Sequence, residues 1–169
     1  MLKAIIAGSY DPLTFGHIDI IRRSLAFCDQ LVIAIGINLQ KKTMFSVEER
    51  LDMLSVSIYD STERITTSSY QGLLVDYAKS IGAKYLIRGV RNAVDFEYES
   101  QLAQINKKIA PEIETVFLLT SPELSVVSSS AVKEIAHYGG DITGFVNPYV
   151  AKKINEKLAF IKAGDPENK

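Results

Sequence analysis

The chain has 169 residues, of which 47% are hydrophobic and 23% are charged, and these proportions exclude disordered, collagen-like and low-complexity proteins. Its 19 basic and 20 acidic side chains give a formal net charge of −1, which argues against general nucleic-acid binding and against attraction to a membrane surface. The single cysteine, Cys28, excludes an intramolecular disulfide and a CxxC motif, and it fits a reducing, cytoplasmic environment.

Five short apolar runs predict five β-strands. They cover residues 4–7, 31–35, 65–67, 85–87 and 115–119. The third run, Ile-Thr-Thr, is weaker than the others. The runs are continuous rather than alternating in apolar character, which is typical of strands that are covered on both faces, as in a parallel sheet. None of the runs is long enough for a signal peptide or a membrane span.

Segments with apolar residues three and four positions apart separate these runs and predict helices. The apolar positions are Ile18, Ile21 and Leu25; Val47, Leu51, Leu54 and Ile58; Tyr98, Leu102, Ile105 and Ile109; and Val150, Ile154, Leu158 and Ile161. A further helix is expected from about Gly72 to Gly82. Ser46 and Glu49 form a capping box that predicts the start of the second helix, and Pro148 suits the first turn of the last helix.

The alternation of strands and helices predicts one α/β domain. We expect a doubly wound, five-stranded parallel sheet with helices on both faces, because right-handed crossovers place helices on either side of such a sheet. The domain is expected to span residues 1–162. Residues 163–169 are polar and are expected to form a frayed tail.

Ligands bind such sheets at the carboxyl ends of the strands, where the strand order switches, so the segments after each strand are the candidate site. In the first of them, the pattern Thr14-x-Gly16-His17 ends where a helix is predicted to begin. Free backbone N–H groups and the helix dipole favour a phosphate there. The alternative is a tight loop with a histidine on the surface.

Basic side chains follow two other strands. Lys41 and Lys42 are either a solvated pair or part of the same crevice. Arg88 and Arg91 lie on either side of a glycine, and their guanidinium groups could donate hydrogen bonds to phosphate oxygens. The alternative is that they form ion pairs with acidic residues on the next helix, Asp95 or Glu99.

A serine-rich segment after the fifth strand precedes another helical pattern. One serine is expected to cap that helix, and the other hydroxyl and backbone N–H groups could hold phosphate. The sequence has no GxxxxGK[ST] loop, no GxGxxG motif and no HExxH motif, which argues against P-loop kinases, nicotinamide-dependent dehydrogenases and a metal held by the protein.

Two of these motifs, residues 14–17 (Thr-Phe-Gly-His) and 127–130 (Val-Ser-Ser-Ser), resemble the signatures of the HIGH-type nucleotidyltransferase superfamily. Within it, residues 8–12, 41–45 and 88–99 resemble the phosphopantetheine adenylyltransferase family in order and spacing. The resemblance runs from Lys3 to about Leu158. It implies a Rossmann-like nucleotidyltransferase fold.

The resemblance implies transfer of AMP from ATP to 4′-phosphopantetheine, with Mg²⁺ that arrives with the ATP. It also implies a homohexamer and feedback inhibition by coenzyme A. The implied site has a catalytic residue, His17; residues for the acceptor, Ser9, Lys41, Leu74 and Arg88; and residues for ATP, Ser9, Tyr10, His17, Gly89, Val90, Arg91, Glu99, Leu124, Ser125, Val126, Val127, Ser128, Ser129 and Ser130.

No protein nucleophile is expected, because the acceptor phosphate itself can attack the α-phosphorus of ATP, and the protein then aligns the substrates and offsets their charge. His17 is expected to donate a hydrogen bond to the α-phosphate. Two alternatives stay open: another enzyme of the superfamily, such as a glycerol-phosphate cytidylyltransferase or a nicotinamide-mononucleotide adenylyltransferase, and a flavodoxin-like binding module that catalyses nothing.

Overall fold

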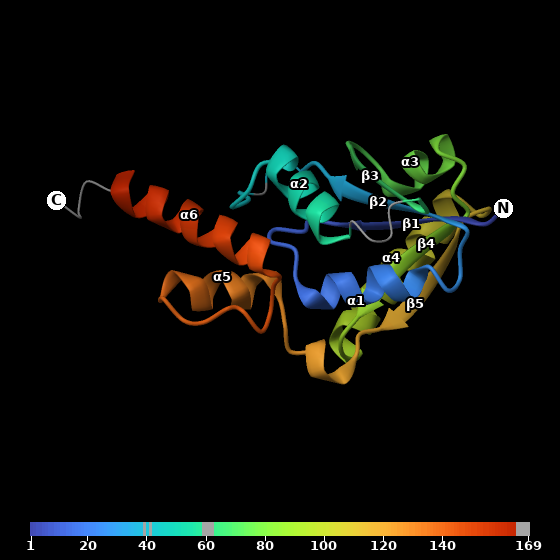
Figure 1. Ribbon diagram of the computed structural model, residues 1–169. Coiled ribbons are helices and arrows are strands. Elements are labelled where there is room, and N and C mark those ends of the chain that lie inside the picture. The colour runs from blue at the N-terminus through green and yellow to red at the C-terminus, as the bar shows by residue number, and fades with distance from the viewer. Residues whose placement is uncertain (39, 41, 59–62, 165–169) are drawn as a thin grey trace.

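The computed structural model of the chain describes residues 1–38, 40, 42–58 and 63–164 (Figure 1). Its elements are β1 (Lys3–Gly8), α1 (Phe15–Ser24), β2 (Gln30–Gly36), α2 (Val47–Ser57), β3 (Ile65–Tyr70), α3 (Leu74–Ser80), β4 (Tyr85–Val90), α4 (Ala93–Ile109), β5 (Glu114–Leu119), the short 3-10 helix η2 (Pro122–Leu124), α5 (Ser129–His137) and α6 (Pro148–Gly164). All five strands that the apolar runs predict are present.

The strands form one parallel sheet in the order β3-β2-β1-β4-β5, so the predicted sheet is confirmed. The strand order switches between β1 and β4. The β1–β2 ladder continues to Gly8, whereas the β1–β4 ladder ends at the pair Ile6–Ile87. The two central strands therefore stop pairing before their carboxyl ends, at the place where a doubly wound sheet binds its ligands.

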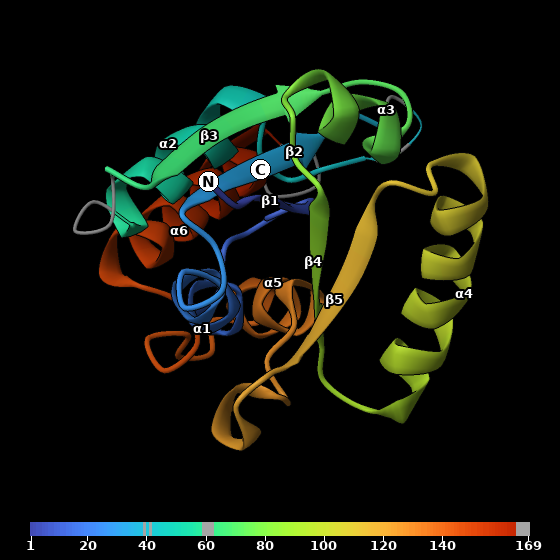
Figure 2. The ribbon, with the colours of Figure 1, turned by 90° about the vertical axis from the view of Figure 1, so that its right-hand side faces the viewer.

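Helices cover both faces of the sheet, as predicted (Figure 2). Side chains of β1 alternate between two apolar clusters: Ala4 and Ile6 belong to the cluster under α1, α2, α5 and α6, and Ile5 belongs to the cluster under α3. This alternation follows from the two-residue period of a strand. It explains why the run of residues 4–7 is apolar without interruption.

The predicted helix signals are found at helix ends. Ser46 and Glu49 form the capping box of α2, Pro148 begins α6, and Gly82 follows α3 with a positive φ of 71°. The β1–α1 loop ends at Thr14, which caps α1 in a second capping box whose N3 residue is His17. A histidine that fills this position is fixed to the start of its own helix.

The sequence placed the end of β4 too early. Arg88, Gly89 and Val90 were expected in a loop after the strand, but they belong to β4 and pair with Phe117, Leu118 and Leu119 of β5. An arginine and a glycine interrupt the apolar run, and backbone pairing with β5 overrides that local pattern.

Helix α4 stands at the side of the sheet and buries none of its 17 residues. Its exposed apolar side chains are Val94, Phe96, Tyr98, Ile105 and Ile109. In the described residues, no helix is both long enough and apolar enough to cross a membrane. The expected tail begins with the last two residues of α6, and 165–169 lie outside the described residues.

Candidate functional site

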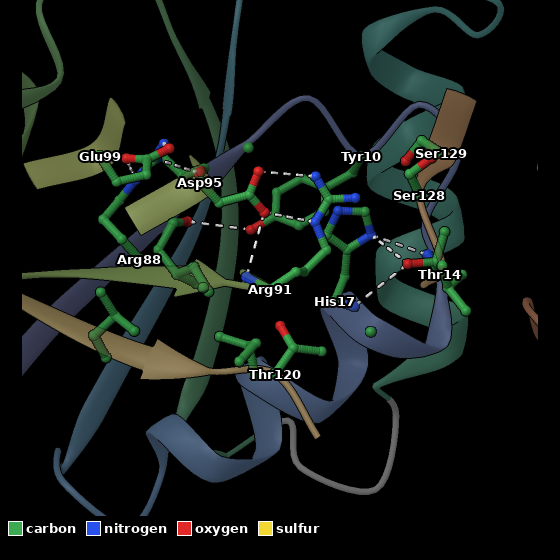
Figure 3. Close-up of a pocket in the computed structure, with 18 of the residues that line it drawn as sticks. Tyr10, Thr14, His17, Arg88, Arg91, Asp95, Glu99, Thr120, Ser128 and Ser129 are labelled. Atoms are coloured by element: carbon green, nitrogen blue, oxygen red, sulfur yellow. Dashed lines mark hydrogen bonds and ion pairs between the residues drawn. The ribbon is translucent and has the colours of Figure 1, made fainter. Parts of the chain in front are cut away.

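A cavity of about 630 Å³ opens where β1 and β4 stop pairing (Figure 3). Six parts of the chain supply its walls: the end of β1 with the loop after it, the start of α1, the end of β4, the first turns of α4, Thr120 after β5 and the start of α5. Its polar or charged side chains are Tyr10, Thr14, His17, Arg88, Arg91, Asp95, Tyr98, Glu99, Thr120, Ser128, Ser129 and Ser130. Three of the segments that the sequence singled out, those with His17, with Arg88 and Arg91, and with the serines before α5, thus meet in one place.

His17 is held by the residue that caps its helix. The backbone N–H of Thr14 donates to Nδ1 of His17 at 3.0 Å, and the Thr14 hydroxyl lies 3.0 Å from the same nitrogen. Because Nδ1 accepts the backbone hydrogen bond, the proton of the neutral ring is on Nε2. The ring of Tyr10 packs edge-on against the imidazole, with 5.2 Å between the ring centres (Figure 3).

Burial, with a smaller contribution from the positive charge of Arg91, lowers the pKa of His17 to about 4. The imidazole is therefore neutral at neutral pH. A neutral ring with its proton on Nε2 donates one hydrogen bond and adds no charge. His17 is thus suited to donate to an anionic oxygen rather than to act as a cation.

The lowered pKa predicts a pH-dependent stability. Above pH 6.5 His17 is neutral in both the folded and unfolded chain; between pH 6.5 and about 4 only the unfolded chain gains the proton, so the folded state loses stability. From pH 7 to pH 5, the wild type should lose about 2 kcal/mol more unfolding free energy than His17→Asn. Urea unfolding of both proteins at the two pH values measures this difference, and equal losses would contradict the assignment.

Both arginines of the cavity are paired with carboxylates of α4. Arg88 donates from Nε and Nη2 to the two oxygens of Glu99, at 2.7 and 2.5 Å, and from Nη1 to the carbonyl of Ala7 at 3.0 Å. Arg91 donates from Nε to Asp95 at 2.8 Å. The pairing that the sequence offered as an alternative is therefore the arrangement found. Each guanidinium has more N–H groups than these bonds use, so each could still donate to a phosphate.

The start of α5 lies in the same cavity, close to the start of α1 (Figure 3). Ser128 caps α5 by accepting from the backbone N–H of Ala131 at 3.0 Å, which confirms that one serine of the run is a cap. Ser129 donates to the carbonyl of Pro12 at 2.8 Å. Two helix N-termini thus face one cavity, an arrangement that favours a polyanion. At α1 the backbone N–H groups of Phe15 and His17 already donate to Phe145 and Thr14, whereas the cap of α5 uses the N–H of Ala131 and leaves those of Ser129 and Ser130 for an anion.

Ten of the residues assigned from the sequence line the cavity: Tyr10, His17, Arg88, Gly89, Arg91, Glu99, Val127, Ser128, Ser129 and Ser130. Ser9, Leu74, Val90, Leu124, Ser125 and Val126 do not line it. Lys41 lies outside the described residues. Val90 is buried at the end of β4, and the side chain of Leu74 packs on the cluster under α3. The ligand contacts of these residues stay predictions.

The sequence did not assign several residues that line the cavity, among them Ile20, Asp95, Tyr98 and Thr120. Ile20 follows His17 by three positions on α1, so helical spacing could have indicated it. Its side chain packs on Gly89, where a Cβ atom would lie 3.0 Å from Cγ1 of Ile20. Gly89 therefore allows α1 to approach β4 closely.

The described residues contain no cluster of three or more histidine, cysteine, aspartate or glutamate side chains that could hold a metal ion. Two carboxylates of the cavity, Asp95 and Glu99, are instead engaged by arginines.

Comparison with known proteins places the chain among nucleotidyltransferases. Residues 5–135 match the family model described as cytidylyltransferase-like. The phosphopantetheine adenylyltransferase of Dictyoglomus thermophilum is 49% identical, over 94% of this chain and 96% of that protein. The enzyme of the same name from Thermotoga neapolitana is 49% identical, over 93% of this chain and 97% of the relative.

Solved structures share the fold. The nicotinic acid mononucleotide adenylyltransferase of Plasmodium falciparum, solved in complex with NaAD, superposes with a TM-score of 0.65. The match covers 91% of this chain and 94% of that structure at 16% sequence identity. An identity this low supports the common Rossmann-like fold and leaves the substrate open.

Proposed function

Because the chain belongs to the phosphopantetheine adenylyltransferase family of cytidylyltransferase-like proteins, we propose that it transfers AMP from ATP to 4′-phosphopantetheine. The products are dephospho-coenzyme A and pyrophosphate, in a step of coenzyme A biosynthesis. The observation that carries the proposal is the identity of about half the residues along nearly the whole chain. The cavity supports it with a neutral histidine, two arginines and two helix N-termini.

The reaction exchanges one P–O bond for another. An oxygen of the acceptor phosphate attacks the α-phosphorus of ATP, and the bond from that phosphorus to the oxygen bridging to the β-phosphate breaks, which releases pyrophosphate. Nε2–H of His17 donates to an α-phosphate oxygen as charge builds there. Such a donor is effective because Thr14 fixes the ring before the substrates bind.

The other groups hold the two anions in line. Arg88, with Lys41, binds the acceptor phosphate, and Leu74 and Ser9 contact the acceptor. Arg91 and the turn at residues 128–130 bind the phosphates that leave. The remaining nucleotide contacts are assigned to Ser9, Tyr10, Gly89, Val90, Glu99, Leu124, Ser125, Val126 and Val127.

Mg²⁺ fits this site as an ion that arrives with ATP. The cavity offers nitrogen donors and hydroxyl groups, and its carboxylates Asp95 and Glu99 are bound to arginines, so the triphosphate and water would supply the ligands. When bound, the ion offsets negative charge on the phosphates.

A panel of acceptors tests the proposed substrate. Purified protein is mixed with ATP and Mg²⁺ and with 4′-phosphopantetheine, nicotinic acid mononucleotide or glycerol 3-phosphate, and pyrophosphate release is followed; CTP replaces ATP in a parallel series. We expect release with ATP and 4′-phosphopantetheine alone. Release with nicotinic acid mononucleotide or with CTP would assign another reaction of the superfamily, and no release at all would favour a binding module.

The proposal includes a homohexamer, supported by helix α4. Exposed apolar side chains such as those of α4 mark an interaction surface, and contact with a second copy of the chain would bury them. Ile105→Glu is expected to shift the assembly to smaller species, because a carboxylate in an apolar contact is costly. Light scattering after gel filtration measures the mass. Val56→Glu makes the same kind of change on α2 and should leave the mass unaltered; dissociation of that variant alone would contradict the role of α4.

Coenzyme A is proposed as a feedback inhibitor, because it contains both the pantetheine arm and the adenylate that the product carries. We also place the reaction in the cytoplasm. A lone buried cysteine, Cys28, supports this location, since nothing in the chain needs an oxidising environment.

A further inference from the structure

A buried carboxylate connects the loop before α1 with two other parts of the molecule. Asp11 is 2% exposed, so its charge requires partners. Its Oδ1 accepts from the backbone N–H of Phe45 at 2.9 Å, and its Oδ2 accepts from the backbone N–H of Met44 at 3.0 Å. The third partner is a charge, Nζ of Lys133, at 3.0 Å from Oδ2.

Lys133 lies on α5, one turn after the serines that line the cavity. The same loop and helix are joined a second time by the hydrogen bond from Ser129 to the carbonyl of Pro12. Helix α5 lies beyond the carboxyl ends of the strands, beside the start of α1 (Figure 1). These two contacts with residues 11 and 12 thus join the start of α5 to the loop that leads into α1.

We propose that Asp11 and Lys133 are positioning residues that set the distance between the two phosphate-binding helix starts. The inference rests on the proposed function, in which His17 at the start of α1 binds the α-phosphate and the start of α5 binds the leaving phosphates. Transfer requires both to be in line with the attacking oxygen. A displacement of about 1 Å in such an arrangement lowers the rate by roughly 10²-fold.

The chain offers a matched control, the ion pair between Lys157 of α6 and Glu49 of α2. Its N–O distance is also 3.0 Å, and the lysine side chains of the two pairs are equally exposed, at 32% and 33%. The Lys157 pair joins two helices outside the cavity. The carboxylates differ, since Glu49 is 35% exposed and Asp11 is 2% exposed, so loss of Lys133 is expected to destabilise the fold more than loss of Lys157. The control shows whether loss of a lysine ion pair by itself changes the kinetic constants.

Lys133→Met keeps the length of the side chain and removes its charge. We expect kcat to fall by about 10²-fold, and the KM for ATP and the KM for pyrophosphate in the reverse reaction to rise at least about 10-fold, while the KM for 4′-phosphopantetheine stays within about twofold. Lys133→Arg should bring kcat, the KM for ATP and the KM for pyrophosphate to within about threefold of the wild type. Lys157→Met should leave all of these constants unchanged. A Lys133→Met enzyme whose kcat and KM values equal those of Lys157→Met, whatever its melting temperature, would overturn the proposal.

Two further measurements keep the proposal testable apart from the reaction. Asp11→Asn removes the charge but keeps an oxygen for one backbone N–H group, and it should raise the same two KM values. Calorimetry of Mg·ATP binding needs no acceptor. If the wild type binds Mg·ATP without turning over 4′-phosphopantetheine, the proposed function fails, while weaker binding by Lys133→Met still supports the positioning role. Equal affinity of that variant and the wild type would overturn it.

Discussion

Replacing His17 with alanine is expected to lower kcat by at least about 10²-fold while the affinity for ATP stays within about threefold. The imidazole donates from Nε2 to a charge that develops only as the reaction proceeds, and its orientation is set in advance by the backbone N–H of Thr14. Loss of one preorganised donor of this kind costs roughly 3–4 kcal/mol of transition-state stabilisation, or about 10²–10³ in rate. The ground state of bound ATP depends on it much less.

Steady-state kinetics and calorimetry with Mg·ATP separate the two quantities. His137→Ala is the control, because it removes the chain's other histidine, which is exposed at the end of α5 and outside the cavity. That variant should turn over at the wild-type rate. A His17→Ala enzyme with an unaltered kcat would remove His17 from the mechanism.

Replacing Arg88 with alanine is expected to raise the KM for 4′-phosphopantetheine at least about 10-fold and to change the KM for ATP far less. Hydrogen bonds to a charged group contribute roughly 1.5–3 kcal/mol, which corresponds to about 10- to 150-fold in affinity. Two effects combine in this variant. It removes the donors to the phosphate, and it leaves the carboxylate of Glu99 without its partner in the cavity.

The double variant Arg88→Ala/Glu99→Gln separates these effects, because it removes the donor and the unpaired charge together. If Arg88 binds the acceptor phosphate, the KM of the double variant stays at least about 10-fold above the wild type. A KM that returns to the wild-type value would show that repulsion by Glu99 alone caused the defect of the single variant.

Much of the fold follows from local patterns. The apolar runs predicted all five strands. The runs in β1, β2 and β4 follow from burial at successive positions, whereas the edge strands β3 and β5 are only partly buried. The capping box at Ser46 and the proline at the start of α6 gave helix starts correctly. The extent of β4 did not follow, because Arg88 and Gly89 are held in the strand by pairing with β5, which no local pattern reveals.

The location of the site was predictable from the sequence, but the ion-pair and hydrogen-bond partners of its side chains were not. The switch in strand order brings the ends of β1 and β4 together, so the topology indicated that His17, Arg88 and Arg91 would meet. Pairing of each arginine with an acidic residue on α4 depends on how that helix lies against the sheet. The role of Asp11 was equally hidden, because its partners lie 33 to 122 positions away in the sequence.

The short ladder between β1 and β4 has a consequence for how the protein opens. The cavity takes one wall from the half of the fold that contains β1 and α1, and the other from the half that contains β4 and α4. Substrates that touch both walls would act as a cross-link between the two halves. Amide hydrogens of Ile6 and Ile87 would then exchange with solvent more slowly when the cavity is filled, because separation of β1 from β4 requires the ligand to dissociate first.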